Sequence, residues 1–167
     1  MKTIRTPAIL LGLLYLGLVL WVSLSMPLLP GRVATHFGMG GRPNGWVSRD
    51  GYRVFILLFG LGMPTFTTLL GFLTRFFPAW TVNVPNREYW LAPERRSATD
   101  AHVLRHCLWL ACLEVAFVGG IHYLTILANN AVPVHMPNGT FLAILGVFLA
   151  SVALWIVSLV GRFRKPV

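Results

Sequence analysis

PAILLGLLYLGLVLWVSLSMPL, the stretch from Pro7 to Leu28, contains no charged residue. A helix needs about 20 apolar residues to cross the hydrocarbon layer of a bilayer, so this stretch is long enough to span a membrane. Three more runs of the same kind follow, at about 54–77, 107–127 and 141–160. Because a chain in lipid must satisfy its backbone hydrogen bonds within each segment, we expect four transmembrane α-helices in one membrane domain (1–167), an all-α polytopic fold.

The composition agrees with a membrane protein. Of 167 residues, 56% are hydrophobic and only 11% are charged, which is far from the composition of a soluble protein. The first apolar run also has features of a signal peptide, because Lys2 and Arg5 precede it and Ser23 and Ser25 offer small residues for cleavage. We favour a retained helix, since the apolar run is long for a signal peptide.

The basic residues that flank the four runs indicate an orientation. If both termini lie on one side, that side holds ten Lys and Arg residues and the opposite side holds four. Cytoplasmic loops are enriched in basic residues, so we expect cytoplasmic termini, an outer loop at 29–51 and a cytoplasmic loop at 78–105. The net charge of +9 then reflects topology and contact with anionic lipid, and we expect no binding of nucleic acid.

The outer loop contains a polar block. It combines Pro and Gly residues, which fix the backbone shape, with His, Asn and Trp residues, which supply hydrogen bonds and a stacking surface. This combination indicates a recognition surface, and Pro43-Asn44-Gly45 predicts a tight turn. The predicted binding residues of the outer loop are Pro30, Thr35, His36, Phe37, Pro43, Asn44, Gly45 and Trp46.

The cytoplasmic loop contains a second unusual run. Pro93 is suited to the first turn of a helix, where Glu94 interacts favourably with the helix dipole, and we expect this helix to continue without a break into the third span. Tyr89 and Trp90 are expected at the membrane interface as an aromatic belt. We interpret the run as an output or docking surface made of Asn83, Pro85, Asn86, Tyr89, Trp90, Pro93 and Glu94.

Both loops carry a resemblance to one family. The outer loop resembles the signature of the bacterial membrane family known as domain of unknown function 1648, at Leu29-Pro30, Thr35-His36-Phe37 and Pro43-Asn44-Gly45-Trp46. Ala34 stands where the family usually has Pro, and Gly38 where Asn or Asp is common. The cytoplasmic run resembles a subset of the same family. The resemblance implies a protein of the bacterial inner membrane, in a family that includes the immunity protein of a sporulation-delaying toxin system.

Glu114 is the one acidic residue inside a predicted span. An ionisable group at that depth is unfavourable unless it is paired, protonated or facing water. Two interpretations stay open. Glu114 either serves the passage of protons or cations, or it is bonded to a hydroxyl group of a neighbouring helix, such as Thr65, Thr67 or Thr68.

The histidines allow more than one interpretation. His36 holds the loop, contacts a partner or ligates a metal, and on the outer side only His122 and His135 are available to complete a metal site with it. His102 and His106 are four residues apart on one helix face, but they lack a third ligand and lie on the opposite side of the membrane. We expect no cofactor and no resident metal.

No motif for a common reaction is present. The sequence has no P-loop, no nucleophile elbow and no dinucleotide-binding glycine pattern. We therefore expect a non-enzymatic recognition, signalling or immunity-type module whose outer loop binds a protein or peptide. Two alternatives stay open: a small permease or channel-like homo-oligomer organised around Glu114, and a metal-dependent membrane enzyme that uses histidines.

Overall fold

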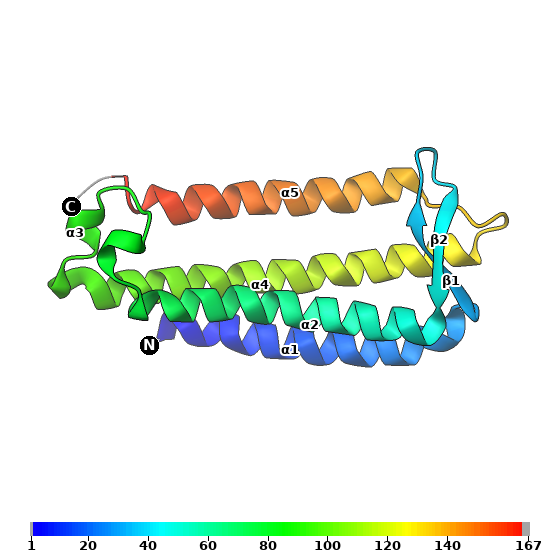
Figure 1. Ribbon diagram of the computed structural model, residues 1–167, viewed down its shortest axis with the longest axis horizontal. Coiled ribbons are helices and arrows are strands. Elements are labelled where there is room, and N and C mark those ends of the chain that lie inside the picture. The colour runs from blue at the N-terminus through cyan, green and yellow to red at the C-terminus, as the bar shows by residue number, and fades with distance from the viewer. Residues whose placement is uncertain (1, 165–167) are drawn as a thin grey trace.

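The computed structural model describes residues 2–164, and these residues form a bundle of four long helices (Figure 1). The helices are α1 (Lys2–Ser25), α2 (Arg49–Leu73), α4 (Pro93–Asn130) and α5 (Asn138–Gly161). Within the described residues, all four are long and apolar enough to cross a membrane. The expectation of an all-α polytopic membrane protein is therefore confirmed.

The longest helix, α4, begins at Pro93 as predicted and continues without a break to Asn130. Proline has a fixed φ and no N–H group, which suits the first helical position. At 1.5 Å per residue its 38 residues extend over about 57 Å, which exceeds the hydrocarbon thickness of about 30 Å. This one helix therefore reaches both ends of the bundle.

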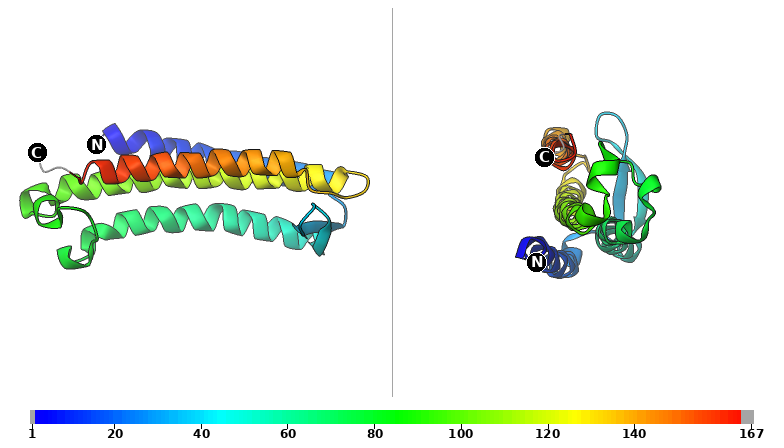
Figure 2. Two further views of the ribbon diagram at one scale, coloured as in Figure 1. Left: turned by 90° about the horizontal axis from the view of Figure 1, so that it is seen from above. Right: turned by 90° about the vertical axis from the view of Figure 1, so that its left-hand side faces the viewer.

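Helix α4 is also the centre of the bundle (Figure 2). On one side it packs against α1 and α2, and this contact contains the apolar core. Gly60 lets α2 approach its neighbours closely, because a Cβ atom there would lie 2.6 Å from Leu18 Cδ2 and 3.0 Å from Val118 Cγ1. On its other side α4 packs against α5, and no described residue of α5 is buried.

A β-hairpin closes one end of the bundle, which we call the hairpin end (Figure 1). After the 3-10 turn η1 (Met26–Leu28), strands β1 (Arg32–Phe37) and β2 (Pro43–Ser48) pair antiparallel. The tight turn predicted at Pro43-Asn44-Gly45 is wrong, because these residues lie in β2. The chain instead reverses between the strands, where Gly40 and Gly41 adopt φ values of 86° and 77° that other residues rarely adopt.

The opposite end, which we call the termini end, carries residues 2 and 164 and the connection between α2 and α4 (Figure 1). This connection contains three short helical turns, η2 (Thr74–Phe76), η3 (Ala79–Thr81) and α3 (Arg87–Trp90). The polar residues singled out in the two loops of the sequence therefore lie at opposite ends of the same bundle.

Candidate functional site

The hairpin is fixed to α4 by the side chain of Asn129. The Ala34 N–H donates to Asn129 Oδ1 at 2.8 Å, and Asn129 Nδ2 donates to the Ala34 carbonyl at 3.0 Å. Both residues are buried. The amide of Asn129 thus pairs with β1 in the way that a residue of a neighbouring strand would.

A second attachment joins the turn of the hairpin to the loop between α4 and α5. The Met136 N–H donates to the Gly41 carbonyl at 2.9 Å, and His135 Nε2 donates to the Gly40 carbonyl at 2.7 Å. A Cβ atom on Gly41 would lie only 2.6 Å from His135 Cε1. Gly41 is therefore required by this close approach as well as by its positive φ.

The two strands are also joined by side chains. His36 Nδ1 donates to Asn44 Oδ1, and the partner of His36 across the ladder is Gly45. A Cβ atom at Gly45 would lie 2.8 Å from His36 Cβ, so only glycine leaves room for the imidazole. These contacts support the interpretation in which His36 holds the loop.

Trp46 contributes aromatic surface to the exposed face of the hairpin. Its side chain is 41% exposed, and the neighbouring Val47 is 40% exposed. Trp46 pairs with Ala34, whose backbone groups point away from β2 towards Asn129. In an antiparallel ladder such a pair turns the backbone groups of both residues outwards. The N–H and C=O of Trp46 therefore face the free edge of β2, and within residues 2–164 they make no backbone hydrogen bond outside the ladder.

The other predicted binding residues of the outer loop have less free surface or no special contact. Phe37 and Pro43 are half-buried and pair with each other where the ladder ends. Pro30 and Thr35 are exposed. Thr35 lies at the irregularity between Ala34 and His36, where β1 has one residue more than β2.

At the termini end, part of the second predicted surface fastens the end of α5. Asn86 Nδ2 donates to the Phe163 carbonyl at 2.7 Å, and Trp90 Nε1 donates to the same carbonyl at 3.3 Å. Trp90 is buried, and its own carbonyl accepts from Thr99 Oγ1 at 2.7 Å. The remaining residues of that prediction are exposed or half-buried: Asn83, Pro85, Tyr89, Pro93 and Glu94.

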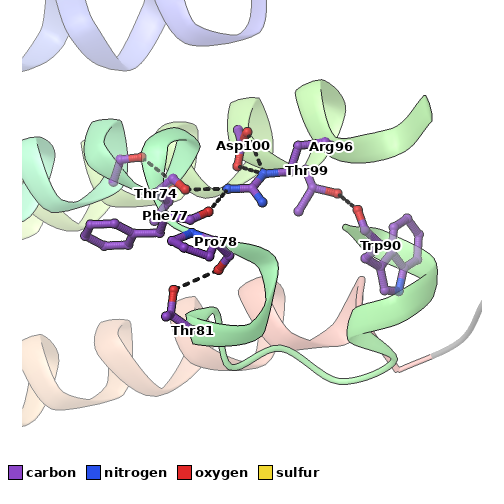
Figure 3. A network of polar contacts seen from close by, with 9 residues as sticks. Thr74, Phe77, Pro78, Thr81, Trp90, Arg96, Thr99 and Asp100 are labelled. Atoms are coloured by element: carbon purple, nitrogen blue, oxygen red, sulfur yellow. Dashed lines mark hydrogen bonds and ion pairs between the residues drawn. The ribbon is translucent and has the colours of Figure 1, made fainter. Parts of the chain in front are cut away.

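Figure 3 shows a polar network that the sequence analysis missed. Arg96 Nε lies 3.1 Å from both carboxylate oxygens of Asp100, and Arg96 Nη2 donates to the carbonyls of Thr74 at 2.6 Å and Phe77 at 2.9 Å. These carbonyls lie just after α2, where the ends of helices leave carbonyl groups with unused acceptor capacity, although the Thr74 carbonyl also accepts from the Phe77 N–H at 3.2 Å. The only signal in the sequence was the spacing of four residues between Arg96 and Asp100.

Glu114 lies inside the bundle and is 7% exposed. Thr67 Oγ1 donates to Glu114 Oε1 at 2.9 Å, so one of the three threonines named from the sequence does contact it. Thr65 is bonded to Tyr15 Oη instead. Within the described residues, Glu114 Oε2 and Thr68 Oγ1 are buried without a hydrogen-bond partner.

His122 belongs to a buried cluster that joins α1, α2 and α4. Tyr52 Oη lies 2.9 Å from His122 Nδ1, and Ser25 Oγ lies 2.7 Å from His122 Nε2. Because Ser25 Oγ donates its proton to the Trp21 carbonyl, Nε2 donates to Ser25 and the Tyr52 hydroxyl donates to Nδ1. His122 is 0% exposed, and its polar atoms are therefore satisfied inside the bundle.

The three histidines considered for an outer metal site, His36, His122 and His135, do not form a cluster. His36 binds Asn44, His135 binds the Gly40 carbonyl and His122 is buried in its own cluster. In residues 2–164, no group of three or more His, Cys, Asp or Glu side chains is placed to hold a metal ion. The shared site of His36, His122 and His135 is therefore wrong.

His102 and His106 face α5 at the termini end. Their ring centroids are 4.1 Å apart, and His106 Nδ1 donates to the His102 carbonyl at 2.9 Å. Ser158 of α5 lies 3.3 Å from His106 Nε2, and Trp155 Nε1 donates to the His106 carbonyl at 2.7 Å. This pair therefore contributes to the contact between α4 and α5.

Comparison with known proteins finds one similarity, which includes the hairpin. Residues 8–61 match the family model described as "Domain of unknown function (DUF1648)", and this segment contains the whole hairpin and parts of α1 and α2. No curated protein and no solved structure matches the chain significantly. The match covers about a third of the chain, and over these residues the chain is similar to the DUF1648 family.

Proposed function

We propose that this protein is a non-enzymatic recognition module of the bacterial inner membrane, and that its hairpin end binds a protein or peptide. The observation that carries the proposal is the exposed Trp46 on a hairpin that is attached to the bundle at two separate points. Aromatic side chains are enriched among the residues that dominate binding energy at interfaces. A fixed hairpin presents Trp46 with little further ordering on binding.

The free edge of β2 supports an extended peptide as the partner. An incoming strand could pair with the outward N–H and C=O of Trp46, as in other complexes where a peptide adds a strand to a sheet edge. Three arginines lie in the hairpin or directly after it, Arg32, Arg42 and Arg49, whereas the nearby acidic residue Asp50 is paired with Arg53 at 3.4 Å. This charge favours a partner segment with acidic side chains.

The proposal includes an orientation with both termini in the cytoplasm and the hairpin outside. The excess of basic residues at the termini end supports it. The test is labelling of a Met39→Cys variant in intact cells with a membrane-impermeant maleimide, since Met39 is fully exposed in the turn. Labelling of intact cells agrees with the proposal, and labelling only after the cells are opened contradicts it.

Partner binding is tested by photo-crosslinking in native membranes. A photoreactive amino acid replaces Trp46 in one variant and the lipid-facing Leu154 of α5 in a control. We expect a discrete product with another protein from position 46 alone. The same product should be lost when His36→Ala removes the bond to Asn44. Only self-crosslinks, or equal products from both positions, would argue against recognition by the hairpin.

A second candidate function is a small permease or channel-like homo-oligomer. It is favoured by Oε2 of Glu114 and the hydroxyl of Thr68, which have no hydrogen-bond partner among residues 2–164. Buried polar groups without partners are rare and often mark ion pathways in membranes. Proteoliposomes with a pH-sensitive or cation-sensitive dye provide the test. Flux that is present in the wild type and absent in Glu114→Gln at equal protein level would favour this candidate, and a wild type without flux would exclude it for the ions tested.

A further inference from the structure

A cleft of about 600 Å³ opens at the termini end, between the short helix α3, the first turns of α4 and the end of α5. Tyr89 and Trp90 form an aromatic wall, and Arg95 and Arg162 approach from α4 and from the end of α5. Gly161 leaves space beside them, because a Cβ atom there would meet no atom within 4 Å. None of the lining residues is acidic.

The guanidinium groups of the two arginines of this cleft lie over aromatic rings, and within residues 2–164 they make no hydrogen bond or ion pair. Arg95 Cζ lies 4.0 Å from the centroid of the Tyr89 ring, and Arg162 Cζ lies 5.4 Å from the ring centroid of Trp90. Stacking uses the flat face of a guanidinium group and leaves its N–H groups free at the edge. Both side chains are exposed, and within residues 2–164 neither takes part in an ion pair.

Other arginines at the same end are already occupied. Arg96 is bonded to Asp100 and to two backbone carbonyls, and Arg87 Nη1 donates to the Trp80 carbonyl at 3.1 Å. The hydrogen bonds of Arg96 and Arg87 therefore give these two residues a structural role. Within residues 2–164, no side-chain hydrogen bond gives Arg95 or Arg162 a comparable structural role.

The helix dipole explains only one of the two positions. Arg162 directly follows the last residue of α5, where a positive charge is favourable. Arg95 lies in the first turn of α4, which begins at Pro93, and a positive charge is unfavourable there. The presence of Arg95 beside Arg162 is therefore better explained by an anion that both could bind.

We propose that this cleft binds a phosphate group, with Arg95 and Arg162 donating to its oxygens beside the aromatic wall. Arginine is well suited to this role because its N–H groups match the geometry of phosphate oxygens. The apolar run of α5 ends at Gly161, so the cleft lies at the depth where lipid headgroups begin. A phosphate could come from an anionic phospholipid or from a soluble compound. This site goes beyond the proposed function, because it does not involve the hairpin.

The test measures the thermal unfolding midpoint of the purified full chain in a neutral detergent. Three probes are titrated: dihexanoylphosphatidylglycerol, the zwitterionic dihexanoylphosphatidylcholine and inorganic phosphate. We expect a saturable rise of the midpoint with the phosphatidylglycerol and none with the phosphatidylcholine. A saturable rise with inorganic phosphate as well would support the site and identify soluble phosphate compounds as a further source.

The double variant Arg95→Gln/Arg162→Gln tests the residues. Loss of two charge-assisted contacts should weaken the apparent affinity for phosphatidylglycerol by about tenfold or more. The matched control is Arg5→Gln/Arg75→Gln, which removes two exposed arginines from the same end of the bundle, one of them stacked on Phe72 at 4.1 Å. The control should keep the wild-type affinity. Equal weakening in both double variants would overturn the proposal, because it would show a non-specific effect of net charge.

A second pair of variants keeps the test decisive if the arginine variant does not fold. Gly161→Glu places a carboxylate in the open space of the cleft, and Gly161→Gln places an uncharged group of the same size there. We expect the Glu variant to lose the response to phosphatidylglycerol and the Gln variant to keep most of it. The same response in both variants, or no saturable response in the wild type, would overturn the proposal.

Discussion

Replacement of Asn129 by Ala should detach the hairpin from α4. The Asn129 amide makes two hydrogen bonds with the backbone of Ala34 and a third with the Thr125 carbonyl at 2.8 Å. Ala34 is 0% exposed, so water cannot replace the lost amide without opening the contact. The variant therefore either buries an unpaired N–H and C=O or lets β1 separate from the bundle.

The structure sets the size of the effect. Each buried backbone group that loses its partner costs about 1 to 3 kcal/mol, so the two groups of Ala34 together should lower the free energy of unfolding by about 2 to 6 kcal/mol. The neighbouring Asn130 provides a matched control. Its Nδ2 donates to the Leu28 carbonyl at 3.1 Å, but this contact is exposed, so water can replace it and Asn130→Ala should cost less than about 1 kcal/mol.

The assay is unfolding in mixed micelles titrated with sodium dodecyl sulfate, followed by tryptophan fluorescence. Hydrogen exchange of peptides that cover β1 is measured in parallel. We expect faster exchange of the Ala34 amide in Asn129→Ala and unchanged exchange in Asn130→Ala. The reasoning is refuted if both variants unfold with the same free energy, or if the exchange of β1 in Asn129→Ala equals that of the wild type.

Three further predictions concern the attachments at the two ends of the bundle. Ala34→Pro removes the N–H that donates to Asn129, and the same titration should show a loss of about 1 to 3 kcal/mol; an unchanged free energy would contradict this. Arg96→Gln removes charge-assisted bonds to a carboxylate and two carbonyls, and we expect a loss of about 2 to 4 kcal/mol with faster proteolysis of the connection after α2. Gly41→Ala combines a φ of 77° with a Cβ only 2.6 Å from His135, so hydrogen exchange in the hairpin turn should accelerate; wild-type exchange would show that the turn adapts freely.

The long helices could be predicted because their signal is local and strong. Each apolar run is long enough to span a bilayer, and Pro93 marks a helix start by its own backbone geometry. The hairpin was not predicted, since its strands are short and contain Pro43 and Gly45, which usually indicate loops. The turn was misplaced for the same reason, because Pro-Asn-Gly is a common turn sequence, while Gly40 and Gly41 reverse the chain.

The contacts that build the candidate site depend on residues far apart in the sequence. Asn129 meets Ala34 across 95 positions, and His122 meets Ser25 across 97. No spacing rule within one helix predicts such pairs. The hydrogen bond between Thr67 and Glu114 could be predicted as one of three possibilities, because a carboxyl group inside a span requires a polar neighbour and few were available.

The length of α4 has a mechanical consequence. Asn129 and Arg96 are attached to opposite ends of the molecule, and the unbroken helix between them separates the two attachments by about 50 Å at 1.5 Å per residue. An uninterrupted series of backbone hydrogen bonds makes a helix stiff. In α4 the only proline is Pro93 at the first turn, so the helix has no proline kink at which it could bend. A force on the hairpin would therefore tilt α4 as a whole, and this tilt would displace Arg96 at the other end of the helix.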